Sequence, residues 1–201
     1  VASVTIPAGS TTATLVIDPN DDAVYEGNET VITTITSVTG GNGATIGTPA
    51  SATTTIVDNE TVPTVTISGG TTIAENSPGT VTLTLTLSAA TTVATTVNLG
   101  YTGTATSGTD YVSGVASVTI PAGSTTATLV IDPTDDVIYE GNETVITTIT
   151  SVTGGNGATI GTPASTTVTI TDDETVPTVT ISGGTTIAEN SPGTVTLTLT
   201  L

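Results

Sequence analysis

The sequence predicts an all-β protein made of tandem sandwich domains. Val81, Leu83, Leu85 and Leu87 alternate with threonines, and this period of two is typical of a strand with one buried face. Thr is the commonest residue, with 56 copies in 201, and both Thr and Val are β-branched side chains that suit a pleated surface. A long internal repeat sets the size of each domain.

The chain repeats itself with an offset of 114 residues. Residues 1–87 match residues 115–201, and 80 of these 87 aligned pairs are identical. This period is too long for one turn of a solenoid, but it is the usual size of a β-sandwich domain. The sequence therefore predicts an array of near-identical domains. The seven differences are Asn20/Thr134, Ala23/Val137, Val24/Ile138, Ala52/Thr166, Thr54/Val168, Val57/Thr171 and Asn59/Asp173.

One complete repeat contains seven segments with strand character. Turn-forming residues separate them, including Ser77-Pro78-Gly79, Pro121-Ala122-Gly123 and Gly154-Gly155-Asn156-Gly157. Seven short strands in about 110 residues predict an immunoglobulin-like Greek-key β-sandwich. In order, the expected strands are 64–74 with an interruption at Gly69-Gly70, 79–87, 92–101, 115–120, 125–132, 143–152 and 166–172.

Two Thr-Val-Pro segments, 61–63 and 175–177, set the phase of the array. Each follows an acidic cluster and precedes a new strand, and a proline at the first residue of a strand costs no ladder hydrogen bond. We expect 1–60 to be the C-terminal half of one repeat, 61–174 a complete repeat, and 175–201 the N-terminal strands of the next. The chain is then expected to be a window from a longer array. Joining the partial repeats of neighbouring chains would still omit the strand Val93 to Tyr101.

The composition excludes several classes of function. The chain has 18 acidic residues and no Lys, Arg or His, which gives a formal net charge of −18. Since nothing can neutralise phosphates, we expect no nucleic-acid partner and no direct membrane insertion. The absence of Cys excludes disulfides, thiolate zinc sites and redox chemistry. Paired carboxylates can hydrolyse glycosides, but the four tyrosines are the only aromatic residues and no nucleophile–base pair is available, so we do not expect an enzyme.

The acidic residues of a repeat lie at strand ends and in loops, whereas the predicted strand faces carry Thr. A purely solubilising role would spread acids over the exposed faces. In an immunoglobulin-like topology alternate connections share one end of the sandwich, so these loops can converge. Carboxylates brought together repel one another, and no cationic side chain is available to compensate. Oxygen ligands without His or Cys favour calcium as the missing cation.

The segment Asp135-Asp136-Val137-Ile138-Tyr139-Glu140-Gly141-Asn142-Glu143 resembles the signature of the Calx-beta family. That family is a β-sandwich module of sodium/calcium exchangers, integrin β4 and large bacterial surface proteins. The segments Ala74-Glu75-Asn76, Gly108-Thr109-Asp110-Tyr111 and Asp172-Asp173-Glu174 lie where the family places them, and all three complete or partial repeats share the resemblance. The resemblance implies a cluster of calcium ions at one end of each sandwich.

The resemblance also implies the calcium ligands. In the complete repeat they are the carboxylates of Glu75, Asp110, Asp135, Asp136, Glu140 and Glu143, the main-chain carbonyl of Ile138, and the closing residues Asp172, Asp173 and Glu174. In the first repeat the matching positions are Asp21, Asp22, Val24, Glu26, Glu29, Asp58 and Glu60. Asn59 replaces an aspartate there, so we expect that junction to hold fewer ions or to bind one more weakly. The third repeat contributes only Glu189, and Asp132 has no ligand position.

The closing acids directly precede Thr61 and Thr175, where the next domain begins. Calcium there would fix the angle between neighbouring domains. We therefore expect a calcium-binding structural repeat of a stalk, adhesin or filament, whose partners are neighbouring repeats and, in a filament, identical chains. A regulatory calcium-sensor module of a larger protein is the alternative. Near-identical copies and the absence of Lys and Arg, which leaves no site for trypsin-like proteases, favour an extracellular or cell-surface location.

Overall fold

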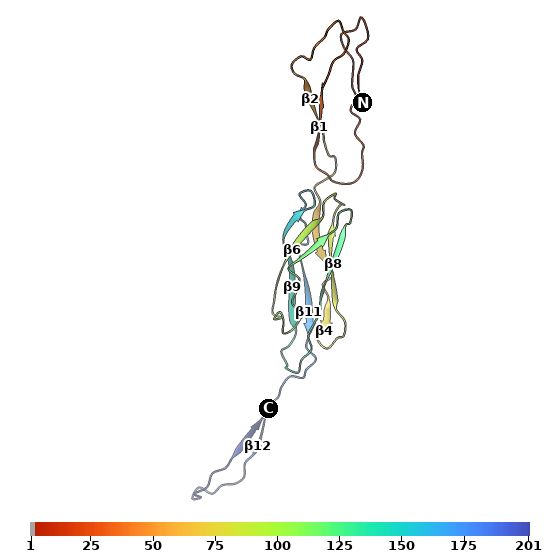
Figure 1. Ribbon diagram of the computed structural model, residues 1–201. Coiled ribbons are helices and arrows are strands. Elements are labelled where there is room, and N and C mark those ends of the chain that lie inside the picture. The colour runs from red at the N-terminus through yellow and green to blue at the C-terminus, as the bar shows by residue number, and fades with distance from the viewer. Residues whose placement is uncertain (1–2) are drawn as a thin grey trace.

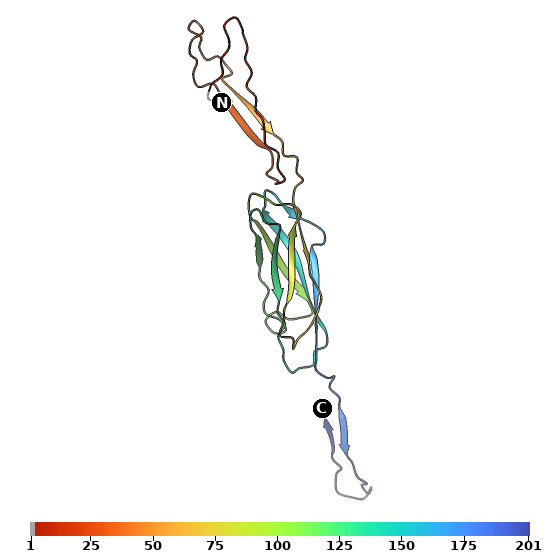
Figure 2. The same cartoon turned by 90° about the vertical axis from the view of Figure 1, so that its right-hand side faces the viewer.

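The computed structural model describes residues 3–201 as an elongated molecule with a central β-sandwich and a strand pair on either side (Figure 1). The view at right angles shows the same three parts in a row (Figure 2). The first pair consists of β1 (Glu29–Thr34) and β2 (Ser51–Ile56), and the last of β12 (Thr180–Gly183) and β13 (Leu197–Thr200). Within residues 3–201 there is no helix that could cross a membrane.

The central sandwich consists of a four-stranded and a five-stranded sheet. The strand orders are β10-β3-β5-β8 and β4-β11-β9-β6-β7. Neighbouring strands are antiparallel, except that β10 runs parallel to β3 and β11 runs parallel to β4. The strands are β3 (Thr64–Ser68), β4 (Thr72–Ala74), β5 (Val81–Leu87), β6 (Thr95–Gly103), β7 (Ser117–Ile120), β8 (Thr126–Ile131), β9 (Glu143–Gly154), β10 (Thr159–Ile160) and β11 (Ser165–Thr171).

These strands confirm the predicted all-β immunoglobulin-like sandwich. Each expected strand is present with ends that differ by a few residues, and the interruption at Gly69-Gly70 separates β3 from β4, which belong to different sheets. A Cβ on Gly70 would lie 2.2 Å from the carbonyl oxygen of Thr167, so the chain can cross between the sheets here only without a side chain. The two-residue β10 was not predicted, because so short a strand has no hydrophobic period.

The core lies between the two sheets. In β5 the alternate residues Val81, Leu83, Leu85 and Leu87 point inward, and their side chains are almost completely buried. The strand faces toward solvent carry mainly Thr. The other buried apolar side chains are Val65, Ile67, Val97, Leu99, Tyr111, Ile120, Leu129, Ile131, Val145, Ile149, Ala158, Val168 and Ile170.

The acidic loops of the sandwich meet at one end because the strands that carry them are paired there. Ala74 at the end of β4 lies opposite Thr171 at the end of β11, and Glu143 at the start of β9 lies opposite Ile170. Two main-chain hydrogen bonds extend this pairing beyond the strands: Glu75 donates to the carbonyl of Thr171 at 3.0 Å, and Thr134 donates to that of Asp110 at 3.0 Å. The chain leaves the sandwich at this same end.

Candidate metal centre

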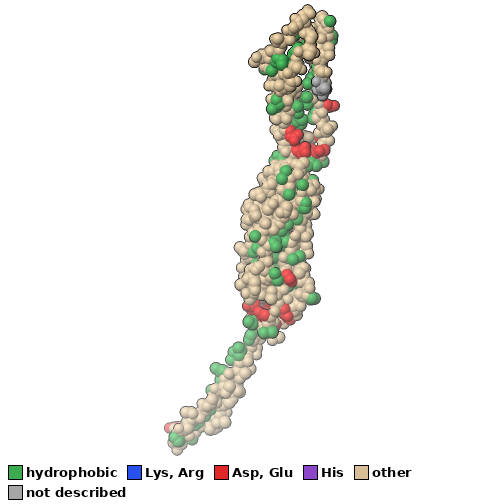
Figure 3. Space-filling model, in the orientation of Figure 1, with side chains coloured by type: hydrophobic (Ala, Val, Ile, Leu, Met, Phe, Trp, Pro, Cys, Tyr) green, Lys and Arg blue, Asp and Glu red, His purple; other side chains and the backbone are tan. Residues whose placement is uncertain are grey.

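The acidic residues gather where one part of the molecule follows another, and the flanks of the sandwich are almost free of them (Figure 3). Two separate groups of carboxylates lie at the end where the chain leaves the sandwich. Within each group every residue offers one carboxylate oxygen, and these oxygens lie within 4.8 Å of one another. We name them the linker group, which consists of Glu75, Asp135, Asp173 and Glu174, and the inner group, which consists of Asp110, Glu140 and Glu143.

The linker group surrounds a buried carboxyl side chain. Glu75 is only 9% exposed, and its Oε1 atom has no hydrogen-bond partner; the same is true of Oε2 of Glu174. Burial, and then the hydrogen-bonded and charged carboxyl of Glu174, raise the pKa of Glu75 to about 7. The charges of Asp172 and Asp173 act in the same direction. Asp173 is positioned by Asn76, whose side-chain amide donates to its Oδ2.

The inner group combines one buried and two more accessible carboxylates. Asp110 is 7% exposed, and its Oδ2 accepts the main-chain N–H of Thr106. Burial, then a hydrogen bond to Asp110 and the charge of Asp110, raise the pKa of Glu143 to about 7. Burial and the charges of Asp110 and Asp136 also raise the pKa of Glu140. The group is therefore short of positive charge.

Two of the expected ligands hold the loop rather than belonging to either group. Asp172 accepts the main-chain N–H groups of Glu140 and Gly141 on Oδ2 and that of Glu174 on Oδ1. Burial alone would raise the pKa of Asp172, but these three hydrogen bonds and a side-chain hydrogen bond with Glu174 outweigh it and lower the pKa. Asp136 likewise accepts the N–H of Ile138 at 2.7 Å. Because both carboxylates face main-chain donors, they shape the loop that carries Glu140.

The first repeat reproduces this loop. Asp22 accepts the N–H of Val24 at 2.8 Å, and Asp58 accepts the N–H groups of Glu26, Gly27 and Glu60. The loop encloses a cavity of about 50 Å³, lined by Asn20, Asp21, Asp22, Val24, Glu26, Gly27, Glu29, Ile56, Val57, Asp58, Asn59 and Glu60.

Within residues 3–60 no three carboxylates approach as closely as in the two groups above. Residues 1–60 do not include the positions that match Glu75 and Asp110. Burial alone would raise the pKa of Asp58, but the hydrogen bonds that its carboxylate accepts lower the pKa. The pKa of Glu60 is raised by a side-chain hydrogen bond with Asp58 and by burial.

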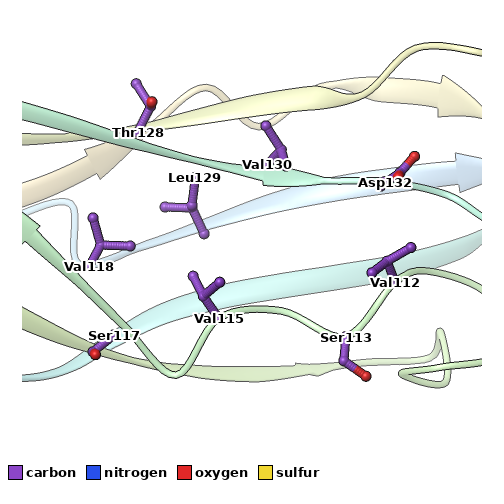
Figure 4. A pocket seen from close by; sticks show the side chains of 9 residues that line it. All are labelled: Val112, Ser113, Val115, Ser117, Val118, Thr128, Leu129, Val130 and Asp132. Atoms are coloured by element: carbon purple, nitrogen blue, oxygen red, sulfur yellow. The ribbon is translucent and has the colours of Figure 1, made fainter.

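Two other acidic residues lie away from these clusters. Glu189 is exposed between β12 and β13, outside both groups. Asp132 lines a cavity of about 510 Å³ at the side of the sandwich, together with Leu129 and Val130 of β8 and Val112 and Val115 (Figure 4). Asp132 is the only charged side chain in that lining.

The donor set of the two groups fits a hard divalent cation. It offers carboxylate oxygens, with no nitrogen or sulfur ligand anywhere in the sequence. The unpartnered buried oxygen of Glu75 and the raised pKa values of Glu75 and Glu143 are the marks of a site that lacks positive charge. A bound cation would supply that charge and favour the ionised form of every carboxylate in the groups.

The comparisons with known proteins agree with this architecture. The Calx-beta domain model matches residues 58–174, and the LapA domain model matches residues 2–59. By the internal repeat, residues 2–59 correspond to 116–173, so the two matches concern closely related sequence. A comparison with curated protein sequences gives no match.

Solved structures of Calx domains resemble part of the chain. The apo-form Calx CBD1 domain is 24% identical and covers 56% of this chain and 99% of its own, with a TM-score of 0.49. CBD12 from CALX1.2 is 23% identical, covering 54% and 45% with a TM-score of 0.47. The calcium binding domain CBD12 of CALX1.1 is 22% identical, covering 59% and 49% with a TM-score of 0.49. Because the Calx-beta match spans more than half of the 201 residues, the chain belongs to the Calx-beta domain family.

Proposed function

We propose that this chain is a calcium-binding structural repeat of an extracellular surface stalk, adhesin or filament, in which calcium stiffens the junctions between domains. Calx-beta domains bind calcium, and both carboxylate groups offer the oxygen ligands that calcium prefers. One observation carries the mechanical part of the proposal. Asp173 and Glu174 of the linker group immediately precede Thr175, where the chain leaves the sandwich, and they face Glu75 and Asp135.

The linker group explains how an ion could change stiffness. Without a cation the charges of Asp173 and Glu174 repel those of Glu75 and Asp135, which pushes the start of the linker away from the sandwich. A cation held by all four carboxylates reverses this force and ties the linker to the sandwich. The inner group, Asp110, Glu140 and Glu143, is proposed to hold a second ion. Asp136 and Asp172 keep the loop in shape, and Ile138 stays a proposed carbonyl ligand.

Small-angle X-ray scattering during a calcium titration tests the proposal. Starting in chelator, the chain is expected to extend and stiffen as calcium is added. A double variant, Glu75→Gln with Asp173→Asn, should lose this response, whereas Asp132→Asn removes one charge outside both groups and should keep it. Identical scattering of the wild-type chain at all calcium concentrations would refute calcium stiffening.

The midpoint of the titration separates two cellular roles. A midpoint of about 10⁻⁴ to 10⁻³ M is the range of extracellular calcium modules and supports the stalk. A midpoint near 10⁻⁶ M is the range of calcium sensors and would favour a regulatory module instead.

Sedimentation in calcium then distinguishes the forms of a surface structure. A stalk is expected to remain monomeric, with only neighbouring repeats as partners. A filament is expected to assemble from identical chains.

A further inference from the structure

The first repeat and the central sandwich touch through neutral groups. Asn156, in the turn between β9 and β10, donates from Nδ2 to the carbonyl oxygen of Tyr25 at 2.7 Å and to Oγ1 of Thr92 at 2.9 Å. Tyr25 also forms a parallel β-bridge with Thr91. A carbonyl oxygen can only accept, so the amide nitrogen of Asn156 must be the atom that faces Tyr25.

The backbone conformation of the turn does not by itself explain why residue 156 is an asparagine. All four residues of Gly154-Gly155-Asn156-Gly157 have positive φ, and that of Asn156 is 52°. This left-handed conformation suits glycine best, and the three neighbours of Asn156 are glycines. A fourth glycine would satisfy the backbone equally well. Asparagine is therefore explained by its amide group, which reaches the preceding repeat.

The segment of the sandwich next to Asn156, Thr91 and Thr92, is fixed by burial and hydrogen bonds. Thr91 is 1% exposed, its hydroxyl donates to the carbonyl of Val93 at 2.8 Å, and its carbonyl accepts the N–H of Gly123 at 2.9 Å. Thr92 is the next residue, and it accepts the second hydrogen bond from Asn156. The sandwich thus presents a fixed docking surface to the loop of the preceding repeat.

The loop on the other side of the contact is the first repeat's copy of the acidic loop at the metal centre. Tyr25 lies between Asp22 and Glu26, and it is half-buried, as is Val24. In the central repeat the matching residues are uncovered, because residues 175–201 do not include a copy of the Asn156 turn. There Val137, Ile138 and Tyr139 are 88%, 61% and 40% exposed.

We infer that the Asn156 turn and the Tyr25 loop form a latch that recurs at every junction of the array. In each repeat the Gly-Gly-Asn-Gly turn docks on the preceding repeat, and the tyrosine loop receives the turn of the following repeat. Asn42, with φ 54° in the identical turn, is then the half that faces the preceding repeat. Tyr139 and its exposed apolar neighbours are the half that faces the following one. The partner of this surface is another copy of the same repeat.

The latch goes beyond the calcium proposal, because its hydrogen bonds join neutral groups and need no ion. Calcium would hold the linker to the sandwich that precedes it. The latch instead sets the orientation of the sandwich that follows.

Distance measurements between two spin labels test the latch in the full 201-residue chain. The sequence contains no cysteine, so Thr34→Cys in β1 and Thr128→Cys in β8 place both labels at exposed strand positions without background. Asn156→Gly removes the amide and keeps the turn, since glycine accepts positive φ. Asn42→Gly is the matched control, because it makes the same change in the same turn, away from this junction.

In saturating calcium, Asn156→Gly is expected to replace a narrow distance distribution with a broad one, and Asn42→Gly to leave it narrow. Equal distributions for the two variants would overturn the latch. Thermal melting of both variants checks that the sandwich is still folded. Repeating the unsubstituted labelled chain in chelator tests the calcium proposal separately, because a width that calcium does not change contradicts stiffening whatever Asn156→Gly does.

Discussion

Glu75→Gln is expected to stabilise the calcium-free domain and to weaken its response to calcium. Glutamine has nearly the shape of glutamate but carries no charge. In chelator at pH 8 the substitution removes a buried carboxylate that has an unpartnered oxygen and lies against Asp173 and Glu174. In calcium the same substitution removes a ligand. One change therefore has opposite signs in the two conditions.

The magnitude follows from the pKa of Glu75, which burial and the neighbouring Glu174 raise from 4.5 to about 7. This difference corresponds to an upper value of about 3 kcal/mol for ionising the side chain in the folded state. Solvent screens part of this interaction, so neutralising Glu75 alone is expected to release only about 1–2 kcal/mol. For a domain of this size, the expected rise in Tm is roughly 4–8 °C.

Calorimetric melting with and without calcium measures both signs. Wild type, Glu75→Gln and Asp132→Asn are melted in chelator and in saturating calcium at pH 8. The control Asp132→Asn removes one charge from the side of the sandwich and should shift both melts equally, so its calcium response stays that of the wild type. The expected pattern for Glu75→Gln is a higher Tm in chelator and a smaller gain on adding calcium, since binding to the folded state stabilises it.

A lower Tm of Glu75→Gln in chelator would refute the reasoning. It would mean that the glutamate makes a favourable interaction in the calcium-free domain, against its unpartnered oxygen and raised pKa. An undiminished gain on adding calcium would remove Glu75 from the ligands.

Three further predictions concern the same end of the sandwich. The calcium-free wild type is expected to lose stability as the pH rises from about 4.5 to about 7, because Glu75 and Glu143 keep protons in the folded state that the unfolded state releases. A Tm that rises over this interval would contradict it. Asp172→Asn is expected to lower the Tm in chelator, since its carboxylate accepts three main-chain hydrogen bonds; an unchanged circular dichroism melt would show that the loop does not need them. Asp173→Asn copies the natural difference in the first repeat and is expected to weaken calcium binding in isothermal titration calorimetry, whereas Asp132→Asn should not; equal isotherms would exclude Asp173.

The longer strands could be predicted because each one has a local pattern of alternating apolar and polar residues, bounded by turn residues. The alternation from Val81 to Leu87 specifies both the strand and its buried face, and Gly69-Gly70 marks the point where the chain changes sheets. The two-residue β10 is too short to show such a pattern. It forms because the turn around Asn156 returns the chain beside β3, and that is a tertiary effect.

The end of the sandwich that carries the acids could also be predicted, but their division into two groups could not. Strand order shows which loops share an end, whereas the approach of individual carboxylates depends on the hydrogen bonds inside the loops. Asp136 and Asp172 look like their acidic neighbours in sequence, yet their carboxylates accept N–H groups from residues 138, 140, 141 and 174, and neither belongs to the two groups. Asn156 was visible only as the one non-glycine residue of a turn. Its partner Tyr25 lies 131 residues away along the chain, beyond any local pattern.

The metal centre and the latch share one loop, and this has a thermodynamic consequence. The carbonyl that Asn156 holds belongs to Tyr25, which is followed directly by the expected ligand Glu26. Any ordering of this loop by the next repeat therefore lowers the entropy that a cation must remove when it binds, and ordering by a cation helps the next repeat to dock. The two couplings must be equal in free energy, because linkage between two binding events is reciprocal. We accordingly expect a docked repeat to bind calcium more tightly than one whose tyrosine loop is uncovered, so that a long array stiffens more cooperatively than its separate repeats would.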